Sequence, residues 1–480
     1  MNRRRRAVVR AFIAACVCAL PGGAAAQAFA DLAPGVRDFV VVPETLVALV
    51  GVRLVDGTGA PARDGVTVVV RDGRIAAVGP TGAVAVPDGA RVVDGAGQTL
   101  MPGLVMLHEH LFYPSGAVRY NTNQNSFPPL YLAGGVTTMR TGGSMETYTD
   151  LRVAREIEAG RAVGPHMDVT GPYLEGEGGF AWGLPALTSP QEARDHVNFW
   201  ADRGVTSFKA YNLIDGATLK AGIEAAHARG IKVTGHLCSI TYREATEMGI
   251  DNLEHGFYAS TDFVADKQPD QCPRGASESL RALDVRSPDF VSLVATMVQH
   301  GVALTSTLTV FERAAAHRPP PPPGAQAAML PELREQVMQR YDARQKSATP
   351  ESLEHLHKMM ALEKAFYDAG GLLVVGTDPT GAGDVVPGYA NQRALQLLVE
   401  MGLSAEKAVE VATRNGAVYL GRADEIGTVA VGKRADLVLV RGDPTADPEA
   451  FRQMTVVFKD GVGYDSAKLF ESVRGWVGVR

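Results

Sequence analysis

The chain has 480 residues, of which 46% are hydrophobic and 21% are charged, a composition typical of a folded globular protein. This length exceeds one small domain and fits a large barrel with a smaller module beside it. The formal net charge of -6 offers no basic surface for phosphate contacts, so the composition argues against a nucleic-acid partner.

The first 28 residues have the layout of a secretory signal peptide. The basic start MNRRRRAVVR precedes the short apolar run AFIAACVCAL, and the small residues of PGGAAAQA offer a cleavage site. The apolar run is too short to span a bilayer comfortably. We therefore expect residues 1–28 to be removed and the mature protein to be periplasmic or secreted, without a membrane span. The alternative is a basic N-terminal arm on a cytosolic protein.

Two of the four cysteines, Cys16 and Cys18, belong to this leader, so the mature chain keeps Cys238 and Cys272. Two cysteines in a protein of this size are not a disulfide framework. The sequence leaves open whether these two pair.

Both ends of the chain have the pattern of short β-strands. Residues 44–100 and 423–480 contain alternating or β-branched runs such as GVTVVVRDGRIAAVG and ADLVLVRGD, separated by turn signals. Between them, residues 101–422 alternate apolar runs with helical stretches. We expect a β-sandwich domain formed by both chain ends, with a larger α/β domain inserted into it.

Eight short apolar runs in the middle region are candidate strands, with helical stretches between most of them. Ser189, Pro190 and Glu192 mark one helix start, as an N-cap, a first-turn proline and a capping-box residue. Alternating βα units of this number predict a parallel (β/α)8 TIM barrel, whose catalytic groups lie at the carboxyl ends of the strands. The eight runs are GLVMLHEH, GVTTMRTG, HMDVTGPYL, GVTSFKAY, IKVTGHL, NLEHGF, VALTSTL and LLVVGTDP.

The segment 314–333, AAAHRPPPPPGAQAAMLPEL, interrupts this pattern after the seventh strand. It is too rich in proline for a helix or a strand, and it predicts a surface excursion. Because it follows a strand end, it could overhang the catalytic face of the barrel.

Four histidines stand late in candidate strands. His108 and His110 share one face of the first strand, because residues i and i+2 of a strand point the same way, whereas Glu109 points the other way. His236 and His255 stand in the fifth and sixth strands. A single such histidine is ordinarily a core residue. Four of them at one barrel mouth predict a metal site, because imidazole suits zinc and its neighbours.

Lys209 and Asp378 stand at the ends of the fourth and eighth strands. A lone ammonium in GVTSFKAY is costly to bury, unless the side chain reaches the surface. A carboxylate after the apolar run LLVVG needs a partner, unless it caps the following turn. A metal cluster at the barrel mouth would give a reason for both residues.

Together these residues resemble the metal centre of the amidohydrolase superfamily. The resemblance runs from about Leu46 to Tyr464 and includes LMPGLVMLHEH before the barrel and GTVAVGKRADLVLV after it. It implies a distorted (β/α)8 barrel with a composite β-sandwich domain. It also implies two divalent metal ions, Zn2+ above all, held by His108, His110, Lys209, His236, His255 and Asp378.

The resemblance also implies a role for each ligand. His108 and His110 would bind the more buried metal together with Asp378, and His236 would bind the second metal with His255. Lys209 would be carboxylated, so that its carbamate bridges the two ions. Asp378 would act as general base and then general acid toward a metal-bridging hydroxide.

Within the superfamily, SFKAYN, LEHGFY and VGTDPTG resemble prolidases, Xaa-Arg or Xaa-Lys carboxypeptidase-like enzymes and ochratoxinase-like amidases. This branch implies cleavage of an amide bond in a small dipeptide-like or N-acyl amino acid substrate. Candidate substrate contacts are Tyr211, Phe180, Trp182 and Tyr258. Phe180 stands where the branch often has a loop histidine, which puts prolidase or basic-residue specificity in doubt.

Other functions stay open at this point. A metal-dependent esterase or lactonase could use the same centre, and a non-catalytic barrel could bind a metal or another ligand. A deaminase is disfavoured, because Lys209 is present and Ser239 stands three residues after His236, where such deaminases carry a glutamate. A homo-oligomer is compatible with the sequence but not indicated by it.

Overall fold

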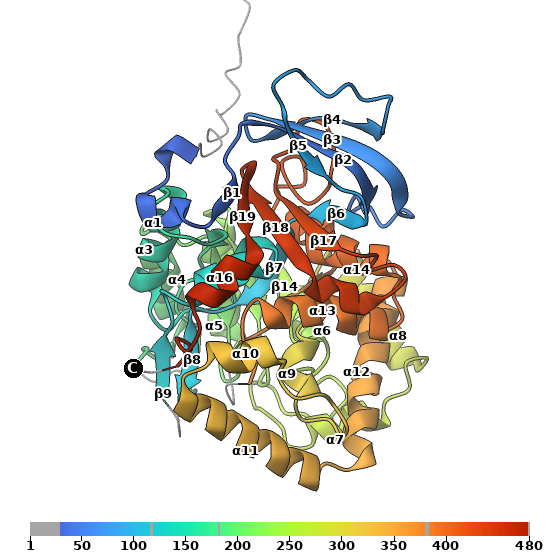
Figure 1. Cartoon of the computed structure of the whole chain (residues 1–480). Helices are drawn as coiled ribbons and strands as arrows, with labels where there is room; N and C mark the ends of the chain where they lie inside the picture. Colours follow the sequence, from blue (N-terminus) through green and yellow to red (C-terminus); the bar gives the residue numbers. More distant parts are fainter. Residues whose placement is uncertain (1–28, 116–118, 181–182, 380–383, 479–480) are drawn as a thin grey trace, which may run out of the picture.

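The computed structural model describes residues 29–115, 119–180, 183–379 and 384–478. The predicted signal peptide therefore lies outside the described residues, and so does Trp182. In Figure 1 the blue strands from the beginning of the chain lie beside the red strands from its end, against the α/β body. Within the described ranges, no helix combines the length and the apolar character needed to cross a membrane.

Strands from both ends of the chain form one nine-stranded sheet, in the order β1-β19-β18-β17-β6-β2-β3-β4 with β5 paired to β2. The two ends of the chain are joined twice: β1 pairs antiparallel with β19, and β6 runs parallel to β2 and antiparallel to β17. The inner faces of the strands enclose an apolar cluster of their own, rich in valine and leucine. This confirms the composite β-sandwich domain. Its strands are β1 (Val40–Val42), β2 (Leu46–Leu54), β3 (Arg63–Arg71), β4 (Arg74–Pro80), β5 (Arg91–Asp94), β6 (Gln98–Pro102), β17 (Leu437–Arg441), β18 (Met454–Lys459) and β19 (Val462–Asp465).

The middle of the chain supplies eight parallel strands, one within each run that the sequence predicts as a strand. They pair as β7-β10-β11 and as β12-β13-β14-β15-β16, and parallel bridges from Thr170 to Ser207 and from Leu174 to Ala210 join the two groups. The strands are β7 (Leu104–Glu109), β10 (Val136–Thr141), β11 (His166–Asp168), β12 (Ser207–Ala210), β13 (Lys232–Gly235), β14 (Asn252–Glu254), β15 (Ala303–Ser306) and β16 (Leu373–Val375).

The barrel closes where the end of β16 meets β7. The backbone nitrogens of Thr377 and Asp378 both donate to the carbonyl oxygen of His108, at 3.1 and 2.9 Å. A Cβ atom at Gly376 would lie 2.4 Å from the His108 nitrogen, so the close approach of the two strands requires glycine there. The distorted (β/α)8 barrel is therefore confirmed, and its last strand brings Asp378 next to the first.

Helices connect the barrel strands. Ser189 caps α4 (Pro190–Ala201) by accepting from the Glu192 nitrogen, as the sequence predicts. The other helices of this layer are α2 (Phe127–Ala133), α3 (Thr147–Glu158), α5 (Gly216–His227), α6 (Tyr242–Met248), α8 (Pro288–Gln299), α12 (Pro350–Asp368), α13 (Tyr389–Glu400) and α14 (Ala405–Glu410).

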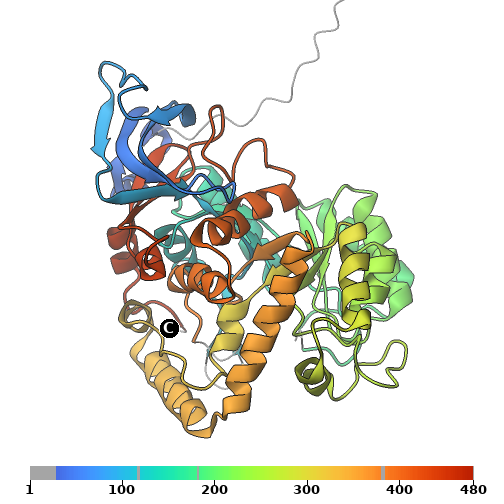
Figure 2. The ribbon, with the colours of Figure 1, turned by 90° about the vertical axis from the view of Figure 1, so that its right-hand side faces the viewer.

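The proline-rich segment contains helix, so the prediction of an irregular excursion is wrong for part of it. Two helices, α10 (Pro323–Ala328) and α11 (Pro331–Ser347), each begin on a proline. A proline in the first turn is tolerated, because its missing N–H would have no partner within the helix. In Figure 2 the orange helices α11 and α12 form a pair whose junction lies at the end of the molecule opposite the blue sheet.

Cys238 and Cys272 form a disulfide bond, with Cα atoms 4.8 Å apart. The bond ties the polar segment after β14 to the residues directly after β13, close to His236. The sequence could not show this pairing, because 34 residues separate the two cysteines and only the fold brings them together.

Candidate metal centre

His108 and His110 lie at the carboxyl end of β7 with buried side chains. The Nδ1 atom of His108 lies 2.7 Å from Glu254 Oε2, and that of His110 lies 3.2 Å from the carbonyl oxygen of Gly143. Both acceptors favour the tautomer with the proton on Nδ1, which leaves each Nε2 with a free lone pair. An imidazole oriented in this way by an outer acceptor is typical of a metal ligand.

Asp378 approaches both of these Nε2 atoms. Its Oδ1 lies 3.7 Å from His108 Nε2 and 3.3 Å from His110 Nε2, and the three side chains offer ligand atoms that all lie within 4.8 Å of one another. Asp378 adopts φ 49°, a left-handed conformation that is uncommon for residues other than glycine. Such a conformation persists only where the surrounding structure enforces it, and it recurs at functional sites.

His236 and His255 lie beside this group, directly after β13 and β14. Their ring centroids are 4.3 Å apart, and the His255 ring lies 4.6 Å from that of His108. His255 Nδ1 lies 2.8 Å from the Thr307 hydroxyl oxygen. Among the described residues, the buried Nδ1 of His236 has no hydrogen-bond partner. A buried nitrogen of this kind is unfavourable unless something binds it, which fits a metal ligand.

Lys209 lies on β12 between the two pairs of histidines. Its side chain is 1% exposed, and its Nζ lies 3.1 Å from His108 Nε2. The rings of Tyr173 and Tyr211 flank it, with centroids 5.7 and 5.6 Å from Nζ. Burial lowers the pKa of Lys209 to about 8, although Glu254 favours its charged form.

The protonation states suit metal binding. Burial lowers the pKa of His110 to about 4 and that of His236 to about 3, and it holds the pKa of His255 well below its usual range. These three imidazoles are therefore neutral at pH 7, the form that binds a metal. Burial opposes ionisation of Asp378, but the neighbouring histidines, His108 first among them, hold its pKa well below the usual range.

A buried ion pair between Arg140 and Glu254, which was not predicted from the sequence, supports the ring of His108. Arg140 Nη2 donates to Glu254 Oε1 at 2.5 Å, and the other oxygen of Glu254 contacts His108. Arg140 Nε also donates to the carbonyl oxygen of Leu107 at 2.8 Å. An arginine within the apolar strand GVTTMRTG poses the same burial problem as Lys209, and that signal could have identified it.

Glu109 lies on the opposite face of β7 and stabilises the turn that carries Asp378. Its Oε1 accepts from the Thr377 nitrogen at 3.1 Å and from Asn391 Nδ2 at 3.0 Å. Burial raises the pKa of Glu109 to about 8. The carboxyl group is thus held outside the ligand cluster.

Aromatic rings border the cluster on the side of β7 and β12. The Phe180 ring lies 4.5 Å from that of Tyr211, which in turn lies 4.6 Å from the His236 ring. Phe112 packs 4.4 Å from His110. Two of the residues predicted to contact substrate, Phe180 and Tyr211, therefore lie next to the candidate ligands.

Tyr258 lies on the other side of the cluster. Its ring stacks on Phe311 with a centroid distance of 3.5 Å, and Phe311 lies 5.7 Å from the His255 ring. The backbone nitrogen of Tyr258 also donates to the carbonyl oxygen of His255 at 3.0 Å, so Tyr258 contacts a candidate ligand through its backbone, whereas its ring reaches the histidines through Phe311.

Known proteins share this architecture. A candidate prolidase from Bifidobacterium longum is 26% identical, with a TM-score of 0.63 over 90% of this chain and 99% of that one. A. niger ochratoxinase has the same fold at 18% identity, with a TM-score of 0.62 over 88% of this chain and 96% of its own. The enamidase of Eubacterium barkeri is 35% identical over 101 residues, which are 21% of this chain and 26% of the enamidase. The chain thus matches about a quarter of the length of that curated relative.

The family comparison covers most of the chain. Residues 99–463 match the model of the amidohydrolase family, and this range includes every barrel strand and all six candidate metal ligands. The barrel, the composite sheet and the buried cluster of histidines and aspartate agree with that match. The chain belongs to the amidohydrolase family.

Proposed function

We propose that the protein is a metal-dependent hydrolase that cleaves an amide bond in dipeptide-like or N-acyl amino acid substrates. The observation that carries the proposal is the cluster of His108, His110 and Asp378, whose ligand atoms lie within 4.8 Å of one another. Membership of the amidohydrolase family and the similarity to a candidate prolidase and an enamidase support an amide-type bond as the target.

The donor set fits two divalent ions, and we assign Zn2+ because neutral imidazoles and a carboxylate suit it. His108 and His110 would hold one ion together with Asp378, and His236 and His255 would hold the other. Ions bound there supply Lewis acidity toward a carbonyl oxygen and lower the pKa of bound water.

We also propose that Lys209 is carboxylated. A bare ammonium 3.1 Å from a candidate metal-binding nitrogen opposes a cation at that place, whereas a carbamate offers two oxygen ligands. Carbamate formation joins the neutral amine to CO2 and releases a proton. The lowered pKa of Lys209, about 8, increases the fraction of neutral amine that can react.

Asp378 is the group assigned to proton transfer. Its carboxylate is ionised in the resting protein, so it can accept a proton from water and pass that proton to the leaving nitrogen. Tyr211 lies beside His236 and can hydrogen-bond the substrate. Phe180 packs on Tyr211 and helps to keep water from this side of the site.

A product-release assay tests the substrate class. Purified protein loaded with Zn2+ is offered dipeptides and N-acyl amino acids, with aryl esters and lactones in parallel. The proposal predicts that at least one amide gives a higher kcat/KM than every ester and lactone. Turnover of esters that is much faster than turnover of every amide would make the protein an esterase instead.

We further propose that the protein acts in the periplasm or outside the cell. The bond between Cys238 and Cys272 supports this location, because disulfides persist in oxidising compartments. Cell fractionation together with N-terminal sequencing of the mature protein tests the proposal. A full-length cytosolic product would contradict it.

A further inference from the structure

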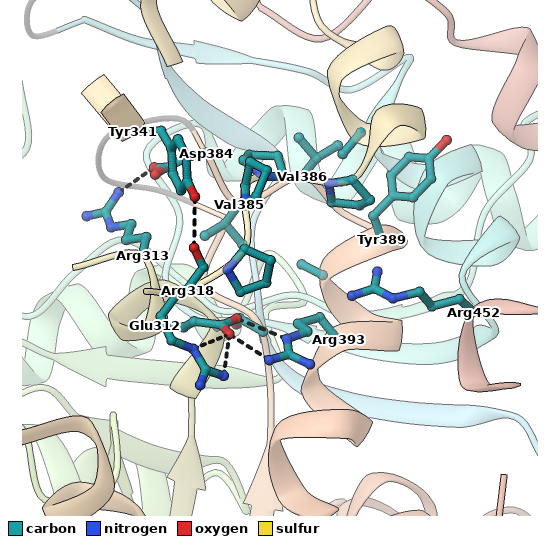
Figure 3. Close-up of a pocket in the computed structure, with 17 residues that line it drawn as sticks. Glu312, Arg313, Arg318, Tyr341, Asp384, Val385, Val386, Tyr389, Arg393 and Arg452 are labelled. Atoms are coloured by element: carbon teal, nitrogen blue, oxygen red, sulfur yellow. Dashed lines mark hydrogen bonds and ion pairs between the residues drawn. The ribbon is translucent and has the colours of Figure 1, made fainter. Parts of the chain in front are cut away.

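A cavity separate from the metal centre lies beside α9 (Leu308–Glu312), the short helix that follows the seventh barrel strand. Thr307 and Phe311 contact His255 on one side of this helix, whereas Thr309 and Glu312 line the cavity on the other. Figure 3 shows the side chains that surround it. Residues 319–322, the helices α11 and α13, and the short helix η3 (Pro448–Arg452) complete the wall.

Four arginines line this cavity, and three of them have buried carboxylate partners. Arg318 and Arg393 lie 2.6 and 2.7 Å from the same oxygen of Glu312, whose side chain is 10% exposed. Arg313 lies 3.0 Å from Asp384, whose side chain is 3% exposed. Each of these three guanidinium groups therefore has a buried carboxylate partner, although three arginines share two carboxylates and leave one positive charge in excess.

Two further charges lie behind the wall and offset each other. Glu400 gives Arg318 and Arg393 a second carboxylate contact, at 2.6 and 3.3 Å. Arg344 gives Asp384 a second guanidinium contact. Because Glu400 is negative and Arg344 is positive, these two residues together do not change the net charge around the cavity.

The fourth arginine, Arg452, is the exception. Its ion-pair partner Glu449 lies 3.2 Å away and is 67% exposed, and its Nη2 donates to the neutral amide oxygen of Gln396 at 2.9 Å. In the part of the chain that the structure describes, no buried carboxylate pairs with it. An ion pair so exposed contributes little, yet the Arg452 side chain is only 22% exposed. Figure 3 shows its guanidinium group directed toward the cavity.

The rest of the wall is largely apolar. It includes the prolines of residues 319–322, Val385, Val386 and the ring of Tyr389. A guanidinium fork matches a carboxylate through two parallel hydrogen bonds, and apolar walls suit a hydrocarbon body. The cavity therefore combines the two features that recognise an organic carboxylate.

We propose that this cavity binds a small organic carboxylate with an apolar body through Arg452, at a site separate from the metal centre. The ligand supplies a buried carboxylate partner for Arg452, whose partner within the protein, Glu449, is largely exposed. The reaction proposed above would release molecules of this class. The second site is nevertheless inferred from the residues that line the cavity and does not require that reaction.

Calorimetric titration of the metal-loaded full chain with 3-phenylpropionate tests the proposal without any turnover. Wild-type protein should bind this probe at least about tenfold more tightly than the neutral 3-phenylpropionamide or inorganic phosphate, because only the carboxylate combines the charge with an apolar body. Arg452→Gln should weaken binding at least about tenfold, and Arg452→Lys, which keeps the charge but not the fork, should weaken it less. If Arg452→Gln does not fold, the affinity of Arg452→Lys for the probe tests the proposal instead.

Two matched variants locate the bound probe. Asp378→Asn, at the metal centre, and Arg474→Gln, in an exposed ion pair, should each leave the dissociation constant within about twofold of wild type. Binding that survives both Arg452 variants, or that disappears in Asp378→Asn, places the carboxylate elsewhere and overturns the proposal. Absence of binding to the wild-type protein also overturns it.

Discussion

Two buried clusters of histidine and carboxylate side chains lie at opposite ends of the barrel. Both offer the same kinds of ligand atoms, in each case within 4.8 Å of one another. The first cluster comprises His108, His110 and Asp378, and the second comprises His166, Asp436 and Asp460. The first lies at the carboxyl ends of the strands, where barrel enzymes place their catalytic groups, and the second at the start of β11.

The two clusters differ in whether the protein itself supplies the cation. In the second, Arg434 lies 2.8 Å from His166 Nε2 and 3.5 Å from Asp460, and Lys459 also lies 3.5 Å from Asp460. These side chains neutralise the carboxylates where the composite sheet meets the barrel. In the first cluster the neighbouring cation is Lys209, which carboxylation would convert into an anion. A buried cluster of histidine and carboxylate therefore indicates a metal only where no side-chain cation already balances it.

The largest expected effect is on turnover. Asp378→Asn should lower kcat about a thousandfold, because it removes the proton-transfer group of the first cluster. The matched change in the second cluster, Asp460→Asn, should leave kcat within about twofold, since it lies at the other end of the barrel. Steady-state hydrolysis of the best amide substrate measures both. Equal losses in the two variants would remove the functional distinction between the clusters.

The second cluster should instead control stability. Arg434→Gln should lower the free energy of unfolding by about 3 kcal/mol, because it leaves buried carboxylates without their cation. Urea denaturation measures this loss, and Arg474→Gln, in an exposed pair, serves as the control with an expected change below about 1 kcal/mol. Loss of bound metal from Arg434→Gln, with unchanged stability, would reverse the roles of the two clusters.

The metal-free protein should become less stable as the pH falls from 6.5 to 4. His110 has a pKa of about 4 in the folded protein against 6.5 for an ordinary histidine, so the unfolded chain takes up the proton first. Its contribution is present above pH 6.5 and is lost progressively toward pH 4, by up to about 3 kcal/mol. Urea denaturation of chelator-treated protein across this range measures the loss. His110→Ala should flatten the dependence, and an unchanged slope in that variant would contradict the assignment.

A smaller effect is expected when Glu254, the carboxylate that contacts His108, is changed. Glu254→Gln should weaken metal binding about 10- to 100-fold, because it removes the carboxylate that orients His108. Glu109→Gln is the matched control, since the carboxyl group of Glu109 has a pKa of about 8 and is largely protonated at pH 7. Competition with a chelator gives both affinities. Equal changes in the two variants would show that the orientation of His108 does not matter.

Much of the fold could be predicted from the sequence, because strand runs and helix caps are local signals. Each of the eight apolar runs contains an observed barrel strand, and Ser189 caps α4. The rule that alternate residues share a face also applies to His108 and His110, since β7 is extended up to Glu109.

Features that depend on contacts between distant segments could not be predicted in this way. His255 and Asp378 have φ angles of 67° and 49°, so strand alternation no longer describes their orientation. The pairing of Arg140 with Glu254 and the disulfide both join segments that only the closed barrel brings together. The cavity beside α9 also depends on distant segments, because Arg452 of η3, near the end of the chain, completes its wall.

The metal content of purified protein tests most directly the claim that metal binds around the first cluster, with the help of His236 and His255, and not at the second cluster. Elemental analysis of wild-type protein, His110→Ala and His166→Ala compares one histidine from each cluster. The wild type and His166→Ala should each carry about two divalent ions per chain, and His110→Ala should lose metal. Metal that stays in His110→Ala but is lost in His166→Ala would contradict the account.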